Sequence, residues 1–174
     1  VRELVDQPRL FGWDWDAAIL MGSGYGQADP AAARARFAAD PGIEDWSGAY
    51  FGTGDVDGRP VPFLGFEPGS TVHPPIVEGR FLRAADEIVL GARTLDALGV
   101  EIGDRVTVGR GPEARRVRVV GTATLPTVGV LHGTYPSLGV GALVDYRLVP
   151  NFDVSAVDEG FTGPNLLLIR TADD

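Results

Sequence analysis

The 174-residue sequence lacks cysteine and lysine altogether, and it has a single methionine and two histidines. A chain without thiols is compatible with an oxidising or a reducing compartment, so the missing cysteines do not indicate a location. The missing lysines make all 15 basic residues arginine, which indicates a GC-rich genome. At this length, with 44% hydrophobic residues, a chain buries roughly 70% of its unfolded surface and needs no disulfide or metal to fold.

Positive charge is also scarce, since the formal net charge is -9. A nucleic-acid partner is excluded, because a duplex binder needs a clustered basic face to displace counterions from phosphates. The acidity also disfavours adsorption of the domain to anionic lipid. The densest basic run is Arg115, Arg116 and Arg118. We interpret it as a solvated strand face whose other face, with Val117 and Val119, turns inward.

Long apolar runs are missing as well. No stretch approaches the ~18 apolar residues that span a bilayer, and no signal peptide opens the sequence. The sequence starts at Val1 without methionine and stops at Asp174, shortly after the apolar run Leu166 to Ile169. We therefore expect a soluble domain excised from a longer protein, with flanking segments on both sides.

Several kinds of catalytic or cofactor site can be tested on the residues. A P-loop needs a lysine, so ATP hydrolysis by that route is excluded. Gly22, Gly24 and Gly26 follow a predicted strand, but the third glycine is one residue too close for a dinucleotide fingerprint, and we expect a flexible connection instead. His73 and His132 lie in Pro/Gly-containing segments with no local partner for metal or triad chemistry, and we expect surface or loop histidines.

Asp14 and Asp16 are two apart in a predicted strand, beside Trp13 and Trp15. They could form a glycosidase-like carboxylate pair, although such pairs usually come from different strands. We favour a polar strand face opposite packed tryptophans. The sequence thus predicts no catalytic, cofactor-binding or metal-binding residue and a protein that is not an enzyme. A secreted acidic hydrolase or carbohydrate-binding domain that uses these aspartates and tryptophans is the alternative.

The first half of the sequence predicts a strand, a helix and a hairpin. The apolar run Trp13 to Met21 predicts a mostly buried strand. Asp29 is the expected N-cap of a helix that starts at Pro30 and runs to Ala39. The hairpin joins strands 46–54 and 59–66 around Asp57-Gly58, which tolerate the positive φ angles of a tight turn. Two prolines, at 60 and 62, remove donors from one side of the second strand and predict an edge there.

The second half predicts short strands and turns. Leu95 and Leu98 lie on a short helix that Gly99 can end with a left-handed cap. The segment 126–141 is expected to be a loop, and Asn165 to Thr171 a central strand. Short strands are predicted at 87–90, 105–108, 116–123 and 142–144. The chain is therefore of the α+β class, with a β-rich lobe inserted into a lobe formed by the first ~70 residues and the last strand.

One ordered set of residues resembles a known family. It comprises Glu78-Gly79-Arg80, Asp86 to Gly91, Leu95, Leu98-Gly99, Ile102 to Val108 and Val117 to Gly121. This order of an "EGR" turn, a strand, a "Leu-Gly" helix end, a "Gly-Asp-x-Val" strand and a "Val-Val-Gly" strand is similar to the extracytoplasmic, MacB-like periplasmic core domain of FtsX-like ABC transporter permeases. Residues 12–16, Gly-Trp-Asp-Trp-Asp, resemble actinobacterial members.

The resemblance implies a fold and a set of partners. It implies a porter-like βαβ lobe at 1–75 and 146–174, with a small β-rich lobe inserted at 76–145. It further implies a position on the extracytoplasmic side of the cell membrane, between the first and second transmembrane helices of a permease. The implied partners are the rest of the permease, a cytoplasmic ABC ATPase subunit and a second permease copy. No cofactor is implied, and the sequence does not select among the family's cargoes.

Overall fold

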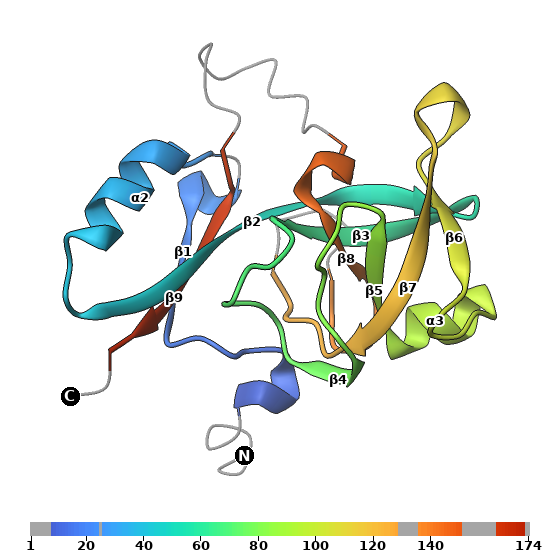
Figure 1. The fold of residues 1–174 in the computed structure, drawn as a ribbon, viewed down its shortest axis with the longest axis horizontal. Helices are drawn as coiled ribbons and strands as arrows, with labels where there is room; N and C mark the ends of the chain where they lie inside the picture. Colours follow the sequence, from blue (N-terminus) through green and yellow to red (C-terminus); the bar gives the residue numbers. More distant parts are fainter. Residues whose placement is uncertain (1–7, 25, 129–135, 151–162, 173–174) are drawn as a thin grey trace.

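The computed structural model describes residues 8–24, 26–128, 136–150 and 163–172. These residues form a mixed nine-stranded sheet with two α-helices, which confirms the α+β class (Figure 1). The strands are β1 Ala17–Leu20, β2 Ile43–Val56, β3 Arg59–Phe66, β4 Ile76–Gly79, β5 Glu87–Gly91, β6 Arg105–Val108, β7 Arg115–Ala123, β8 Ala142–Asp145 and β9 Leu166–Thr171. The helices are α2 Pro30–Ala38 and α3 Ala92–Leu98, and short 3-10 turns cover Pro8–Phe11, Met21–Gly24, Gly111–Glu113 and Tyr146–Leu148.

The first lobe is a split βαβ unit. Strand β9 lies between β1 and β2 and is antiparallel to both, so β1 and β2 run parallel with α2 connecting them. The four residues Leu166 to Ile169 of β9 are all buried, which confirms the predicted central strand. Asp29 caps α2 as expected, since its carboxylate accepts the Ala31 and Ala32 N–H groups at 2.8 and 3.3 Å.

The predicted strand from Trp13 to Met21 is wrong in its first half. Only Ala17–Leu20 pairs as β1, and this strand is not mostly buried as predicted: Ala17, Ile19 and Leu20 are exposed, because β1 is an edge strand of the sheet. In front of it the rings of Trp13 and Trp15 approach each other, with centroids 5.1 Å apart, so they do not alternate with Asp14 and Asp16 across a pleat. Packing of two tryptophans against one core therefore overrides the alternating pattern.

Six strands close into a small barrel. Each of β2, β3, β8, β5, β7 and β6 pairs with the next, and β6 returns to β2 through Val56 and Val108. Two backbone hydrogen bonds, Asp57 N to Thr107 O and Gly109 N to Asp55 O, each 2.9 Å, flank this closure. Every one of the six strands contributes to the interior, which consists of Val56, Val61, Phe63, Ile88, Leu90, Val106, Val108, Val117, Val119, Ala142 and Val144.

A second core lies outside the barrel wall. It contains Leu64 and Val89 from barrel strands, Leu166 and Leu168 from β9, and Trp15 from the incoming segment. Since alternate residues of a strand face opposite sides, the barrel strands serve both cores. The barrel draws β2 and β3 from residues 1–75 and its other strands from 76–145. The division of the chain at residues 75 and 145 stays a prediction.

The hairpin formed by β2 and β3 has the predicted turn, with φ angles of 47° at Asp57 and 82° at Gly58. The edge predicted from the two prolines is confirmed for Arg59 to Pro62 only. Beyond them β3 pairs in parallel with β8 through Phe63 to Phe66, because the prolines no longer remove donors there. Long strand β2 runs from the first lobe into the barrel, as Figure 1 shows.

The structure confirms the strands and the short helix that were predicted between residues 87 and 144. Strands β5, β6, β7 and β8 fall where expected, and α3 ends at Gly99 with a φ of 67°. In the predicted loop 126–141 the isolated bridges Leu125–Leu138 and Ser137–Val140 occur, and residues 129–135 lie outside the described part. No helix in the described ranges is long and apolar enough to cross a membrane.

The helix α2 packs weakly on the sheet. None of its residues is buried, and its contact with the sheet includes an edge-to-face pair of Phe37 and Trp46 with centroids 5.2 Å apart. Replacing Asp29 by alanine should cost this helix about 1 kcal/mol. Because so little of the core depends on α2, hydrogen exchange should quicken within Pro30–Ala38 while the global unfolding midpoint stays unchanged. A large shift of the urea unfolding midpoint in Asp29→Ala would contradict the view that α2 packs weakly on the sheet.

Candidate functional site

The "EGR" turn is built around an ion pair between Arg80 and Glu87. The guanidinium binds both carboxylate oxygens, with Nη1 donating to Oε2 at 2.8 Å and Nη2 to Oε1. The backbone N–H groups of Arg83 and Ala84 also donate to Oε2, at 2.7 and 3.2 Å. The Glu87 side chain is 11% exposed, so its charge is nearly enclosed by these donors. They hold the chain between β4 and β5 in one conformation.

This arrangement shifts the protonation of Glu87. The Arg80 guanidinium lowers the pKa of Glu87 to about 2, against the opposing effect of burial, and the two backbone N–H groups lower it further. A folded-state pKa below the unfolded value of 4.5 means that the ionised form contributes stability above that value, and the contribution disappears as pH falls towards 2.

The acid dependence gives a measurable prediction. Between pH 5 and pH 2, Glu87 alone should remove at most about 3 kcal/mol from the free energy of unfolding. Other carboxylates titrate in the same window, so the contribution is the difference between wild type and Glu87→Gln in urea unfolding at each pH. The free energies of unfolding of wild type and Glu87→Gln, each plotted against pH, should converge as the pH approaches 2. Curves that stay parallel down to pH 2 would show that the ion pair does not stabilise the fold.

Two glycines of the ordered set let β4 and β7 approach closely. Gly79 has a φ of 75°, and a Cβ built there would lie 2.3 Å from the Val120 carbonyl oxygen. A Cβ at Gly121 would lie 2.7 Å from the Arg80 and Glu78 carbonyl oxygens. At the end of α3, the Gly99 N–H bonds the Leu95 and Asp96 carbonyls in a left-handed cap. These residues therefore shape the backbone.

A cleft lies where the chain enters and leaves the described domain. Its volume is about 510 Å³, and it is lined by Pro8, Arg9, Leu10, Trp13, Asp14, Trp15, Asp16, Glu44, Arg170 and Thr171. Both sequence-predicted carboxylates line it, together with Arg9, Glu44 and Arg170, which sequence reasoning missed. Arg9 and Arg170 are distant in sequence, and no local pattern indicates that they meet. The volume is in the range of small-ligand sites.

The two aspartates of the cleft, Asp14 and Asp16, already have partners. Arg9 Nη2 donates to Asp14 Oδ2 at 2.8 Å. Asp16 Oδ2 accepts the backbone N–H of Thr171 at 2.8 Å and its hydroxyl at 3.1 Å, while Arg170 donates to the Asp14 carbonyl at 3.2 Å. These bonds join the incoming segment to the outgoing strand β9. The aspartates thus have a structural use in this arrangement.

The tryptophans of the cleft belong partly to the core. Trp15 is 7% exposed and packs in the second core, and Trp13 packs against that core from a half-buried position. The Trp15 Nε1–H group is buried without a hydrogen-bond partner among the described residues. Trp13 is therefore the aromatic face that remains available to a ligand.

His73 lies elsewhere, stacked on Phe81 with ring centroids 3.9 Å apart and planes 4° apart. Burial lowers its pKa, and Nδ1 lies 2.8 Å from the Pro74 carbonyl oxygen. His73 lies in the loop between β3 and β4, as expected, and its half-buried ring packs on Phe81. His132 lies outside the described residues. Within the described ranges, no group of three or more His, Cys, Asp or Glu side chains is placed to hold a metal ion.

The glycine-rich connection and the arginine run follow the expected structural interpretation. Gly22 and Gly24 take positive φ angles of 50° and 94°, and the Gly26 N–H bonds the Met21 carbonyl at 3.0 Å, which produces a compact turn before α2. Val117 and Val119 are fully buried in the barrel. The alternate arginines of β7 point outward, as predicted.

The chain was compared with protein families, curated proteins and solved structures. No protein-family model matches the chain, and no curated protein matches it. Among solved structures, it is similar to a crystal structure described as "a domain of a putative Permease protein from Porphyromonas gingivalis", with 13% sequence identity and a TM-score of 0.47. The match covers 76% of this chain and 58% of that one, so the chain spans little more than half the length of that structure.

Proposed function

We propose that this chain is the extracytoplasmic domain of an FtsX-like ABC transporter permease, and that it transmits ATP-driven movement to substrate export or to a partner. The ordered residues from Glu78 to Gly121 support the family. The observation that carries the proposal is the junction of β1 with β9, where Asp16 bonds Thr171. A domain that is entered and left at one place suits insertion between two consecutive membrane segments.

The strand arrangement supplies a means of transmission. At its first residues β2 pairs with β9 beside the incoming segment, and at its last residues it closes the barrel. Its 14 residues extend roughly 45 Å at the rise of a β-strand. A displacement of the flanking membrane segments would therefore reach the barrel through a continuous strand. The energy would come from a cytoplasmic ABC ATPase subunit, and a second permease copy would complete the transporter. The domain itself would need no catalytic residue, cofactor or metal.

The complete gene and cysteine labelling test this proposal. Apolar helices long enough to span the membrane should directly precede residue 1 and follow residue 174. Because the chain has no cysteine, Ala35→Cys, exposed on α2, can be introduced into the full-length protein. A membrane-impermeant maleimide should label it in intact cells.

Ala142→Cys is the matched control, since Ala142 is completely buried in the barrel and should react only after denaturation. Labelling of Ala35→Cys only after cell lysis would place the domain in the cytoplasm and overturn the proposal. Absence of flanking membrane segments from the complete gene would do the same.

A secreted carbohydrate-binding or hydrolytic domain is the alternative, and the cleft with Trp13, Asp14 and Asp16 is the observation that favours it. A sugar that stacks on the half-buried Trp13 should change tryptophan fluorescence. Titration with soluble cell-wall and plant oligosaccharides, repeated on Trp13→Ala, would test it. A saturable signal that Trp13→Ala abolishes would favour this alternative, and the absence of any signal would leave it without support.

A further inference from the structure

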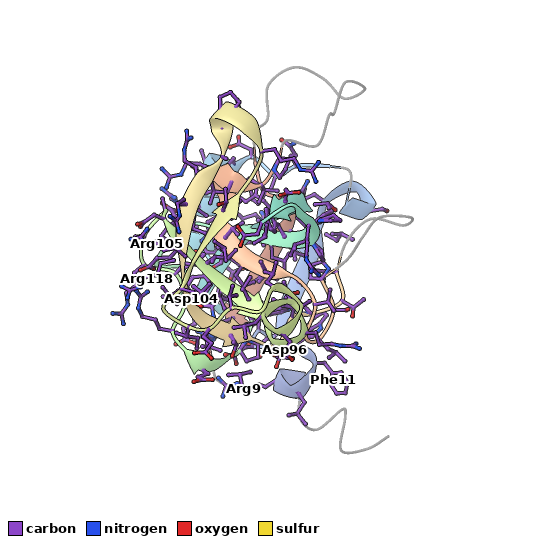
Figure 2. The ribbon with its side chains drawn as sticks, turned by 90° about the vertical axis from the view of Figure 1, so that its right-hand side faces the viewer. Arg9, Phe11, Asp96, Asp104, Arg105 and Arg118 are labelled. Atoms are coloured by element: carbon purple, nitrogen blue, oxygen red, sulfur yellow. The ribbon has the colours of Figure 1, made fainter. Side chains whose placement is uncertain are left out.

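The outer face of the β6–β7 hairpin carries three arginines and one threonine: Arg105, Thr107, Arg116 and Arg118. We call this surface the arginine face. In the antiparallel register Arg105 lies opposite Arg118, and Thr107 lies opposite Arg116. The alternate residues Val106, Val117 and Val119 point into the barrel and are buried. The four residues therefore share the outward side of a rigid, packed sheet. Figure 2 shows Arg105 and Arg118 side by side at the surface.

The three arginines of this face have no carboxylate partner within the described ranges. The ion pairs found there use Arg9, Arg80, Arg110 and Arg147. Two neighbouring acids are engaged elsewhere: Asp57 accepts the Thr107 N–H at 2.8 Å, and Asp104 accepts the Glu101 N–H at 2.9 Å. Glu87, which lies opposite Arg118 on β5, is held by Arg80.

Such a cluster is unfavourable for the isolated domain. Like charges directly opposite one another on paired strands destabilise a sheet. The chain has 24 acidic residues against 15 basic ones. Acidic residues are therefore abundant enough to neutralise the arginine face within the chain. A localised positive face on an acidic protein attracts and orients an acidic partner.

The spacing of the face matches an extended acidic segment. Paired strands lie about 4.8 Å apart, and alternate residues along one strand are about 6.7 Å apart. One carboxylate can sit between Arg105 and Arg118, and a second can bond Arg116 and the Thr107 hydroxyl. Carboxylates at alternate positions of an extended chain have the same repeat of about 6.7 Å.

We propose that the arginine face binds an extended acidic segment of a partner polypeptide, with Asp or Glu at alternate residues, laid along β7. The inference depends on the register, exposure and charge of these side chains and not on the proposed transporter function. Charge-assisted bonds from guanidinium to carboxylate would supply the specificity.

The test uses fluorescent octapeptides and the 174-residue chain. A peptide of alternating threonine and glutamate should bind saturably at low ionic strength in fluorescence anisotropy. A peptide of the same composition, with its threonines and glutamates in two blocks, should bind more weakly. The double variant R116Q/R118Q should weaken binding of the alternating peptide roughly tenfold or more, since it removes one guanidinium from each of the two carboxylate positions.

The control is R34Q/R36Q, which removes the same number of exposed charges, two residues apart in the sequence, from α2. It should bind the alternating peptide as wild type does. If both double variants weakened binding equally, net charge alone would explain the binding and the proposal would be overturned. Equal binding of the alternating and block peptides would overturn it as well. Binding to phosphatidylglycerol vesicles without binding to the peptide would also overturn it. Circular dichroism of each variant would verify that the fold is kept.

Discussion

Replacing Glu87 by glutamine should lower the free energy of unfolding by about 2–3 kcal/mol at pH 7. The substitution keeps the shape of the side chain but removes the charge that Arg80, Arg83 and Ala84 bond. It also turns an amide NH2 towards donors, because Glu87 accepts hydrogen bonds with both carboxylate oxygens. The estimate stays below that for a fully enclosed pair, since the Arg80 side chain is 36% exposed. Urea unfolding followed by circular dichroism measures the difference.

Two further variants locate the source of this loss. Glu113→Gln changes the same group at an exposed position and should leave stability within about 0.5 kcal/mol of wild type. Arg80→Gln should cost less than Glu87→Gln, because the backbone N–H groups of Arg83 and Ala84 would still hold the carboxylate. A smaller loss for Glu87→Gln than for Arg80→Gln would refute the view that Glu87 is the centre of this turn.

The parts of the fold that sequence analysis predicted correctly are those with local causes. The Asp57-Gly58 turn needs positive φ angles that these two residues tolerate, and Asp29 before Pro30 provides a cap within its own helix turn. The left-handed cap at Gly99 is equally local. In each case the residues that specify the structure are within a few positions of one another.

Barrel closure could not be predicted in the same way. The alternation in Arg105 to Val108 indicates a strand with one buried face, but it does not say which strand completes the ring. The closing pair, Val56 and Val108, joins two apolar residues that resemble every other inward valine. Partner choice depends on the summed fit of six strands, and a single sequence does not display that.

The cleft shows a second limit. Alternation of tryptophan and aspartate from Trp13 to Asp16 favours a strand, yet the core requires the two rings to lie together. Asp14 and Asp16 then find partners in Arg9, Arg170 and Thr171, two of which lie at the opposite end of the sequence. The Arg80–Glu87 pair differs, because its basic and acidic residues are seven positions apart and gave a local signal that sequence analysis did not use.

The second large effect is expected from Gly79→Ala, which should destabilise the domain by about 2–5 kcal/mol. The alanine Cβ would need both a left-handed backbone, with a φ of 75°, and space that the Val120 carbonyl oxygen occupies at 2.3 Å. That oxygen belongs to the backbone of β7 and accepts the Arg80 N–H at 3.0 Å, so it cannot move aside without breaking the contact between β4 and β7.

Gly58→Ala separates these two causes. Gly58 has a similar φ of 82°, but a Cβ there meets no atom within 4 Å. This control should therefore show only the conformational cost, about 1–2 kcal/mol, and the excess loss in Gly79→Ala measures the steric conflict with β7. Equal losses in the two variants would mean that β4 can shift away from β7 freely. The close approach of the "EGR" turn to Val120 and Gly121 would then not be what fixes this corner of the barrel.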